Sequence, residues 1–184
     1  MTCIVAVKHK DKVVLGGDSA LVDLSNGNKV KLNTPKVFQC FSYIIGYAGS
    51  ARMGQLLQNY FMPSDPPENS NELTLHMVTT FVDELRALAE EKGLRLDASN
   101  EEANDFAQII VGVNGRIFVI EEDWQASEWA YDYAAIGSGS SAALGSLYTT
   151  SKLGVDPEIR VRYALMAATE HTLTVSEPYH VVIK

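Results

Sequence analysis

The segment Thr2–Lys8 constrains the fold of this chain more than any other, because it is apolar on both faces of the strand that it would form. Successive residues of a strand point to opposite faces, and the run Cys-Ile-Val-Ala-Val places apolar side chains on both. A strand with two apolar faces is covered on both sides, so other layers have to lie above and below its sheet. We therefore expect this segment in the interior of a layered core.

The rest of the sequence supplies these layers in a regular order. Further apolar strands are expected over residues 13–18, 37–48, 106–113, 116–120 and 179–183, and helices over 51–61, 75–94, from 140 onward and from 157 onward. Strand groups that alternate with helix pairs are typical of two stacked antiparallel sheets with helices outside each. We predict an α+β fold, a four-layer α-β-β-α sandwich, in which residues 1–184 form a single domain.

Helical spacing also predicts which side chains of the helices are buried. The segment Asp156-Pro157-Glu158 carries a capping aspartate and a proline at the first helical position, as helix starts do. In that helix the residues expected to face the core are Ile159, Tyr163, Met166 and Ala167. In the helix over 75–94 they are Val78, Phe81, Val82, Leu85 and Leu88. The polar segments 23–34 and 97–105 are expected to be loops, and Trp124, Trp129 and Tyr131 continue in strand-like polarity.

Composition and charge exclude several classes of partner. The net charge is −8 and no run of basic residues is present, whereas nucleic acids and anionic membranes require clustered Lys and Arg. Cys3 and Cys40 lie in apolar segments without a CxxC or Cys/His cluster, so neither a disulfide framework nor a zinc site is expected. No apolar run approaches the ~18 residues of a membrane span, and no basic leader precedes an apolar run. We expect a cytoplasmic protein with no membrane and no nucleic-acid partner.

The first two residues, Met1-Thr2, suggest a specific chemistry. A threonine that directly follows the initiator methionine becomes N-terminal once that methionine is removed. Its hydroxyl can then attack an acyl carbon while its own free amine acts as the base. Because a hydroxyl residue at position 2 is common, this position by itself indicates only the opening of a strand.

Four further stretches stand in order behind Thr2. They are Gly17-Asp18-Ser19, Pro35-Lys36-Val37, Gly46-Tyr47-Ala48-Gly49-Ser50 and Ala135-Ile-Gly-Ser138-Gly. Together with Thr2-Cys-Ile-Val-Ala-Val, these stretches resemble the motifs of proteasome β-type subunits, of the N-terminal nucleophile (Ntn) hydrolase class. In style the chain is similar to the bacterial proteasome-like protease that works with an unfoldase ATPase. The resemblance covers essentially the whole chain and implies the same four-layer sandwich.

The resemblance implies a catalytic role for each of five residues. Thr2 would be the nucleophile, and its freed amine, with an ordinary pKa of about 7.7–8.0, would be the base. Lys36 would place a positive charge beside both groups, disfavour protonation of the amine and stabilise the developing alkoxide. Asp18 would pair with Lys36 and keep it charged. The backbone N–H of Gly49 would bind the oxyanion, and Ser138 would hydrogen-bond the amine and shuttle its proton.

Taken without the resemblance, the same residues have simpler interpretations, which stay open. Asp18 ends an apolar strand, Lys36 is a solvated turn lysine like Lys29 and Lys31, and Gly49 caps the turn into a helix. Cys3 would need two residues removed before it could act as an N-terminal nucleophile. The segment Gly137–Ser141 lacks the Lys-Ser/Thr of a P-loop. The histidines show no metal-ligand spacing; they are His9, His76, His171 and His180.

The resemblance also places a substrate pocket and one departure from the family. Tyr47 and Ala51 fall where the family lines its substrate pocket, and Tyr47 suggests a restricted one. Thr172 occupies the place, near the end of the last long helix, where eukaryotic members carry an aspartate. No cofactor is required, and backbone carbonyls at this helix end could hold a monovalent or divalent cation, as in several relatives.

The function implied is a threonine-type endopeptidase subunit that hydrolyses peptide bonds through an acyl-enzyme on Thr2 after removal of Met1. Its substrate would be a peptide or unfolded protein. Because family members enclose the nucleophile in rings, we expect a homo-oligomeric ring or stack of rings, which an unfoldase ATPase could feed. Two alternatives are kept: a catalytically silent proteasome-like ring or assembly protein, and an Ntn amidase that acts on a small amide.

Overall fold

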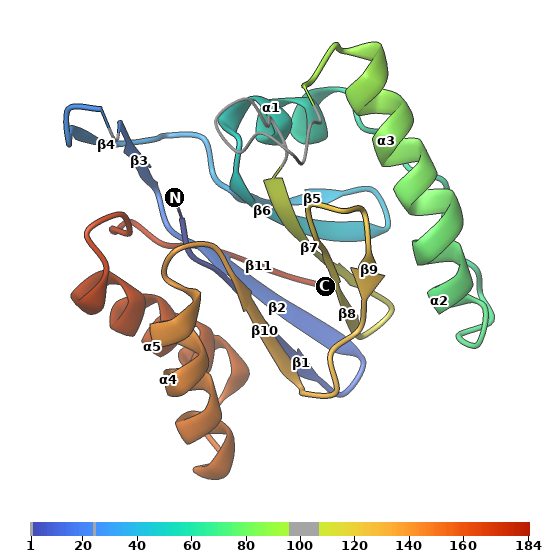
Figure 1. The fold of residues 1–184 in the computed structure, drawn as a ribbon. Coiled ribbons are helices and arrows are strands. Elements are labelled where there is room, and N and C mark those ends of the chain that lie inside the picture. The colour runs from blue at the N-terminus through green and yellow to red at the C-terminus, as the bar shows by residue number, and fades with distance from the viewer. Residues whose placement is uncertain (1, 24, 96–106) are drawn as a thin grey trace.

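Two antiparallel sheets lie face to face at the centre of the structure, a computed structural model that describes residues 2–23, 25–95 and 107–184 (Figure 1). The first sheet has the order β10 (Tyr133–Ile136), β1 (Ile4–His9), β2 (Lys12–Gly17) and β11 (His180–Ile183). The second has the order β5 (Val37–Cys40), β6 (Tyr43–Gly49), β7 (Ala107–Val113), β8 (Arg116–Ile120) and β9 (Ala126–Ser127). The hairpin β1–β2 thus forms the middle of the first sheet, flanked by strands from the far end of the chain.

Helices cover the outer face of each sheet (Figure 1). The first sheet packs against α4 (Ser140–Lys152) and α5 (Pro157–His171). The second packs against α1 (Ala51–Asn59), α2 (Leu73–His76), the π-helical turn η1 (Met77–Phe81) and α3 (Val82–Glu91). A third apolar cluster fills the space between the two sheets. The predicted four-layer α-β-β-α sandwich is confirmed. None of the helices in the described ranges is long and apolar enough to cross a membrane.

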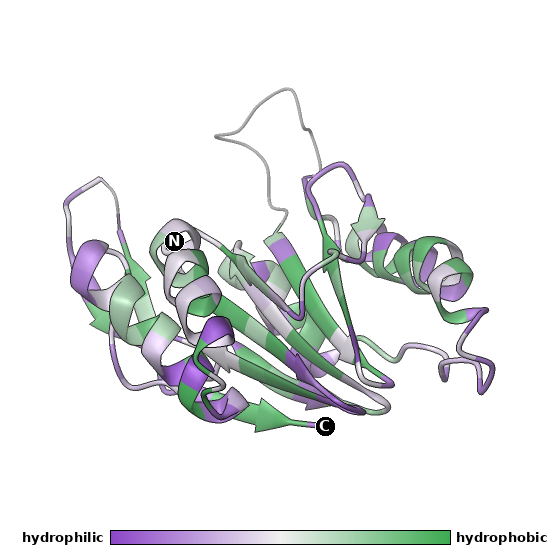
Figure 2. Ribbon diagram, turned by 90° about the horizontal axis from the view of Figure 1, so that it is seen from below, coloured by the Kyte–Doolittle hydropathy of each residue, from purple (hydrophilic) through white to green (hydrophobic). Residues whose placement is uncertain are grey.

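β1 is buried on both of its faces, as its sequence predicts. Ile4 and Ala6 belong to the cluster between the sheets, whereas Val5 and Val7 belong to the cluster under α4 and α5. All four side chains are fully buried. Figure 2 shows the same pattern across the molecule, with the central strands largely in the hydrophobic colour. The start of β1, and with it Thr2, is therefore held by packing from two directions.

A short strand, β4 (Lys29–Lys31), appears within residues 23–34, where the sequence predicts a polar loop. β3 (Ala20–Val22) pairs with β4 in a separate two-stranded sheet. Each strand has only three residues and β4 is exposed throughout, so the apolar alternation that marks a strand is too short to be seen. In the Trp124–Tyr131 region the sequence instead predicts more strand than the structure has, because only Ala126–Ser127 forms a strand there. The expected loop over residues 97–105 lies outside the described residues.

The predicted buried face of α5 is wrong. Ile159, Tyr163 and Met166 are 44–52% exposed. The residues that face the first sheet are instead Val161, Ala164, Leu165 and Ala168. Both sides of this helix carry apolar residues, so periodicity alone does not distinguish them, and packing against α4 and the sheet decides. The outer side of α5 is left apolar and exposed.

The helix over 75–94 differs from the prediction at one position. Phe81, Val82, Leu85 and Leu88 are buried as expected, but Val78 is 43% exposed and Met77 is fully buried. The cause is the π-helical turn Met77–Phe81, because a π-turn inserts an extra residue and shifts the phase of the buried face. Straight α-helical spacing cannot anticipate that shift.

The shifted phase predicts that two adjacent substitutions have very different effects on the free energy of unfolding. We expect Met77→Ala to lower the free energy of unfolding by about 2–5 kcal/mol, since it removes a fully buried side chain. Val78→Ala, at an exposed position, should change it by no more than about 0.5 kcal/mol. Denaturant titration of both variants measures this. A larger loss for Val78→Ala would contradict the described register.

Candidate active site

Three strand ends bring Thr2, Asp18 and Lys36 together. Thr2 precedes β1 and Asp18 follows β2, and these two strands pair with Ile4 opposite Gly17. Lys36 precedes β5 of the facing sheet. Because both sheets end at this side of the sandwich, the three side chains meet in a common buried site, with residue exposures of 0–3%.

The ammonium group of Lys36 donates three hydrogen bonds. Its Nζ lies 2.7 Å from Thr2 Oγ1, 3.0 Å from Asp18 Oδ1 and 2.5 Å from the carbonyl oxygen of Ala20. These acceptors account for all three protons of a charged lysine. Lys36 is therefore not the solvated turn lysine of the simpler interpretation, whereas Lys29 and Lys31 on β4 are exposed.

Asp18 receives four hydrogen bonds in a fully buried position. Besides Lys36, its carboxylate accepts from the backbone N–H of Cys3 at 3.0 Å, of Ala20 at 2.8 Å and of Ser176 at 3.4 Å. These donors come from the start of β1, the start of β3 and the segment after α5. The Lys36–Asp18 pair thus ties together the segments that surround Thr2.

Burial changes the pKa values of two groups beside Thr2. Removal from water lowers the pKa of Lys36, and the nearby Asp18 carboxylate opposes this shift. Burial and the negative charge of Asp18 raise the pKa of the Cys3 thiol to about 12. Cys3 therefore stays protonated at neutral pH, and its fully buried side chain packs in the cluster under α4 and α5. A nucleophilic role for Cys3 has no support.

The turn between β10 and α4 holds the backbone of Thr2. The Thr2 N–H donates to Ser138 Oγ at 3.2 Å, and the Gly139 N–H donates to the Thr2 carbonyl at 3.2 Å. Gly137 has a φ of +86°, and a Cβ on it would lie 2.3 Å from the Thr2 carbonyl oxygen. Only glycine fits there. Ser138 is therefore placed against the very nitrogen that would become the amine.

Thr174 is a residue of this site that sequence reasoning did not identify. Its Oγ1 lies 2.7 Å from Ser138 Oγ. The expected Thr172 is instead the C-cap of α5, with an extended backbone. Thr172, Thr174 and Ser176 alternate after the helix, so several hydroxyl residues are candidates. The sequence shows that alternation, but only the path of the turn decides which one reaches Ser138.

A cavity of about 110 Å³ opens beside Thr2. Lys36, Tyr47, Gly49 and Ala51 line it together with Thr2, and the remaining lining residues are Ala20, Leu21, Val22 and Leu32. Gly49 ends β6 with a φ of +122°, in the region that favours glycine. The structure thus brings the predicted nucleophile, charge, oxyanion donor and pocket residues to one place.

Solved structures similar to this chain share its fold over nearly their whole length. BPH from Thiobacillus denitrificans, solved in complex with epoxomicin, aligns with a TM-score of 0.78 at 22% identity, covering 99% of this chain and 97% of its own. A second structure of BPH from the same organism gives a TM-score of 0.76 at 22% identity, with the same coverage of both chains. HslV from Trypanosoma brucei gives 0.68 at 24% identity, with 98% of each chain covered. This chain has the proteasome-type Ntn-hydrolase fold. No protein-family model matches the sequence, and no curated protein matches it.

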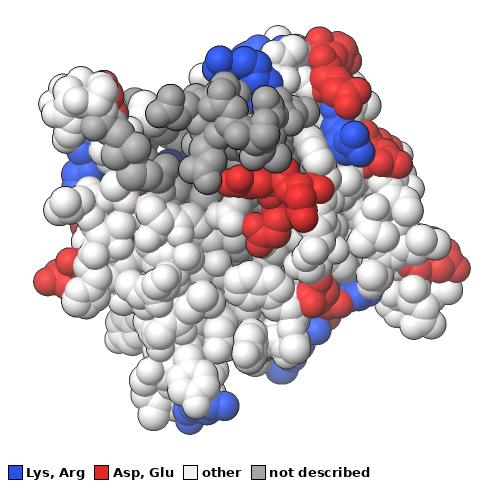
Figure 3. All heavy atoms as spheres, viewed as in Figure 1, with Lys and Arg blue, Asp and Glu red and all other residues white. Residues whose placement is uncertain are grey.

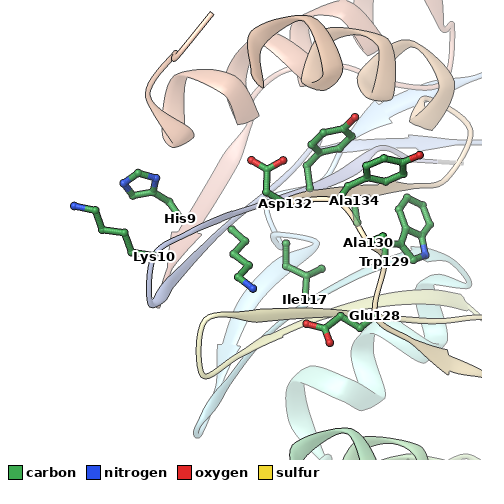
Figure 4. A pocket seen from close by; sticks show the side chains of 11 residues that line it. His9, Lys10, Ile117, Glu128, Trp129, Ala130, Asp132 and Ala134 are labelled. Carbon is green, nitrogen blue, oxygen red and sulfur yellow. The ribbon is translucent and has the colours of Figure 1, made fainter. Parts of the chain in front are cut away.

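A larger cavity, of about 390 Å³, lies at the other end of β1 in this Ntn fold (Figure 4). His9, Glu128, Trp129 and Asp132 are among its lining residues, and none of the predicted site residues is. Its carboxylates are already paired: Asp132 with Arg160 at 2.7 Å, and Glu128 with Arg116. The smaller cavity beside Thr2, rather than the larger one, carries the candidate chemistry.

A cation at the end of α5 would depend on backbone carbonyls. Within the described ranges, no group of three or more His, Cys, Asp or Glu side chains is arranged to hold a metal ion. The Thr172 carbonyl at this helix end already accepts a hydrogen bond from the Val175 N–H at 3.3 Å. A cation at this helix end stays a prediction.

The buried pair predicts a pH-dependent defect in Asp18→Asn. This change leaves the Lys36 ammonium buried without its counter-charge, so we expect a loss of about 3–5 kcal/mol in the free energy of unfolding at neutral pH. Loss of Asp18 also lowers the pKa of Lys36 further. Between that lowered pKa and the unfolded value near 10.4, the unfolded chain binds more protons than the folded protein. The stability of the variant should therefore rise with pH in this window, and its deficit should narrow.

Denaturant titration across this pH range measures the effect, with Asp83→Asn on the exposed start of α3 as the control. The control should lie within about 0.5 kcal/mol of wild type. A deficit of Asp18→Asn that grows with pH would contradict the described charge pair.

Proposed function

We propose that this chain is an N-terminal threonine peptidase subunit that hydrolyses peptide bonds at Thr2 after removal of Met1. The observation that supports this most directly is the 2.7 Å hydrogen bond from Lys36 Nζ to Thr2 Oγ1, inside a buried network and beside a cavity. A surface threonine has no need of a buried ammonium on its hydroxyl, and burying a charge is costly unless it is paired. During catalysis, the positive charge of Lys36 would stabilise the alkoxide that forms on Thr2 Oγ1.

In the first half of the reaction, Thr2 Oγ1 attacks the carbonyl carbon of the peptide bond. Its proton passes to the free α-amine of Thr2, and Lys36 stabilises the negative charge that develops on Oγ1. The backbone N–H of Gly49 binds the oxyanion of the tetrahedral intermediate. The amine then gives its proton to the departing peptide nitrogen, assisted by Ser138, and an ester on Thr2 remains.

In the second half, the same groups hydrolyse the ester. Water attacks the acyl carbon while the Thr2 amine accepts a water proton. Collapse of the second tetrahedral intermediate releases the new carboxylic acid and returns the proton to Thr2 Oγ1. Each half of the reaction therefore uses the Thr2 amine once as base and once as acid. Ser138 Oγ lies 3.2 Å from the Thr2 nitrogen, within hydrogen-bond distance of that amine.

Removal of Met1 is essential to this mechanism, because an amide nitrogen cannot accept the hydroxyl proton. A peptide epoxyketone such as epoxomicin tests it, and BPH was solved in complex with that compound. We expect natively expressed protein to lack Met1 by intact mass, and to gain the mass of one epoxomicin per chain. Thr2→Ser, which keeps both hydroxyl and amine, should still react. Thr2→Ala and Lys36→Met should not.

Four outcomes would contradict the mechanism or favour one of the alternatives. Retention of Met1 in every chain would contradict the mechanism as stated. Loss of Met1 without reaction would favour a catalytically silent assembly protein. Reaction without cleavage of any peptide would favour an amidase for small amides. Unchanged labelling of Thr2→Ala would remove Thr2 from the role of nucleophile.

We further propose that copies of this chain assemble through the outer side of α4 and α5. Tyr148, Leu153, Tyr163 and Met166 are 50–70% exposed there. Figure 3 shows that the surface over α4 carries almost no charged atoms in this view, although the net charge of the chain is −8. Exposed apolar patches of this kind mark protein contacts. A ring of copies would enclose Thr2, so its substrates would be unfolded chains, and an unfoldase ATPase could deliver them. The two buried free thiols fit a reducing cytoplasm.

The proposed interface predicts that Tyr163→Glu reduces assembly. A buried, unpaired carboxylate at a contact between copies is unfavourable, so the variant should shift from the wild-type oligomer toward monomer at micromolar concentration. Leu75→Glu, at a 63% exposed position on α2, makes a comparable apolar-to-acidic change in the other helical layer and should leave the mass unchanged. Light scattering coupled to size exclusion measures both. A monomeric wild type, or equal effects of the two variants, would contradict the interface.

A further inference from the structure

We propose that the larger cavity, at the far end of β1, binds a small nucleotide, with its phosphate on Lys8 and Lys10 and its base stacked on Tyr131. The length of β1 separates this cavity from Thr2, which at about 3.3 Å per residue amounts to roughly 20 Å. The inference therefore goes beyond the proposed peptidase function and does not depend on it.

The cavity has the size and the construction of a ligand site. Its volume of about 390 Å³ falls within the roughly 300–1,000 Å³ that is typical of small-molecule pockets. The ends of β1 and β10 contribute lining residues from the first sheet, and Ile117 of β8 contributes one from the second. In Figure 4, His9 and Lys10 stand at one side of the cavity, and Glu128 and Trp129 stand at the other. The space suits an organic molecule rather than a single ion.

Lys8 gives this cavity a positive charge that is not paired within the protein. The residue is half-buried, and among the described residues no hydrogen bond or ion pair to its ammonium is found. The carboxylate of Glu128 is already engaged, because Arg116 binds both of its oxygens, through Nε at 3.0 Å and through Nη2. Arg116 above all, and to a smaller extent the charge of Lys8, lower the pKa of Glu128. Lys8 is thus close to a carboxylate that has no oxygen left for it.

The charges around the cavity add up to a positive site on a negative protein. Asp132 pairs with Arg160 at 2.7 Å, so both carboxylates that line the cavity are neutralised by arginines. Lys8 and the exposed Lys10 remain as positive charges, although the net charge of the chain is −8. A lysine ammonium binds phosphate as a point charge. The ligand that this balance favours is an anion.

Two stacked tyrosine rings supply a surface for a planar group. The rings of Tyr131 and Tyr133 lie nearly parallel, with centroids 5.4 Å apart and an interplanar angle of 12°. Tyr133 is only 7% exposed, and the guanidinium of Arg160 lies over its ring at 5.6 Å. Tyr131 is 64% exposed. The stack is therefore fixed at its inner end and open at its outer end, and nucleobases stack on open aromatic rings of this kind.

Asp132 favours a nucleotide over a simpler aromatic anion. Arg160 binds its Oδ2, and among the described residues no donor is hydrogen-bonded to Oδ1. An ionised carboxylate accepts several hydrogen bonds, so a sugar hydroxyl between base and phosphate can donate to Oδ1. A half-buried lysine alone would mark no site, because lysine stems commonly lie along apolar surface. Here the cation, the ring and the acceptor line one cavity.

Calorimetry of the full chain with AMP, adenosine and inorganic phosphate tests this site. We expect AMP to bind at least about tenfold more tightly than adenosine or phosphate, because only AMP engages both the cation and the ring. Its affinity should fall as salt is added. Lys8→Met should weaken AMP binding about tenfold and leave adenosine binding unchanged. Tyr131→Ala should weaken both about tenfold and leave phosphate binding unchanged.

Two further variants make the test specific to the cavity. Lys29→Met removes an exposed lysine from β4, which does not line this cavity, and should keep the wild-type affinity for AMP. If Lys8→Met fails to fold, Lys10→Met replaces it, because Lys10 is an exposed residue that lines the same cavity. This variant should also weaken AMP binding and leave adenosine binding unchanged.

Several results would overturn the proposal. One is no binding of AMP at millimolar concentration, and another is binding that neither Lys8→Met nor Tyr131→Ala changes. Phosphate that binds as tightly as AMP would exclude a nucleotide as the ligand. If Tyr131→Ala changes the mass of the assembly by light scattering but not the affinity for AMP, Tyr131 belongs to a contact between copies instead. Labelling of Thr2 by epoxomicin decides none of these outcomes, so the peptidase function stands or falls separately.

Discussion

The buried ion pair between Lys36 and Asp18 is the interaction on which the rest of the site depends. Two charges removed from water are costly, and their mutual attraction compensates only when every remaining donor and acceptor is also satisfied. Here the compensation comes from the backbone: Asp18 accepts from Cys3, Ala20 and Ser176, and Lys36 donates to the Ala20 carbonyl. The pair is therefore stable only if several chain segments stand in their observed places. It acts less as a source of net stability than as a requirement on geometry.

That requirement links the sandwich to its chemistry. Stacking places the entry of β1, the exit of β2 and the entry of β5 at one edge, where apolar layers exclude water around Lys36. The same exclusion that lowers the pKa of Lys36 also strengthens the effect of its charge on Thr2 Oγ1, since charges interact more strongly in a dry environment. The cost of burying the charge and its effect on the nucleophile thus have a single physical origin.

Sequence reasoning succeeded where a single segment carries the signal. The two-sided apolarity of β1 implies the layers, and short motifs point to Asp18, Lys36 and Ser138, which the structure places around Thr2. It failed where the outcome depends on how two segments meet. The buried face of α5 is chosen by packing, the phase of Met77 is set by a π-turn, and Thr174 rather than Thr172 reaches Ser138 because of the path taken after the helix. The β3–β4 hairpin was missed because strands of three residues are too short to show a period.

Two glycines shape this site although neither of them carries a reactive side chain. At Gly137 a Cβ would collide with the carbonyl of Thr2, and at Gly54 it would collide with the ring of Tyr47. One glycine lets a turn close on the backbone of the proposed nucleophile, and the other lets a helix close on the wall of the cavity beside Thr2. Neither contributes a reactive group, and both act only once a second segment is in place. The chemistry of the site therefore depends as much on space left empty at these two positions as on the charges of Lys36 and Asp18.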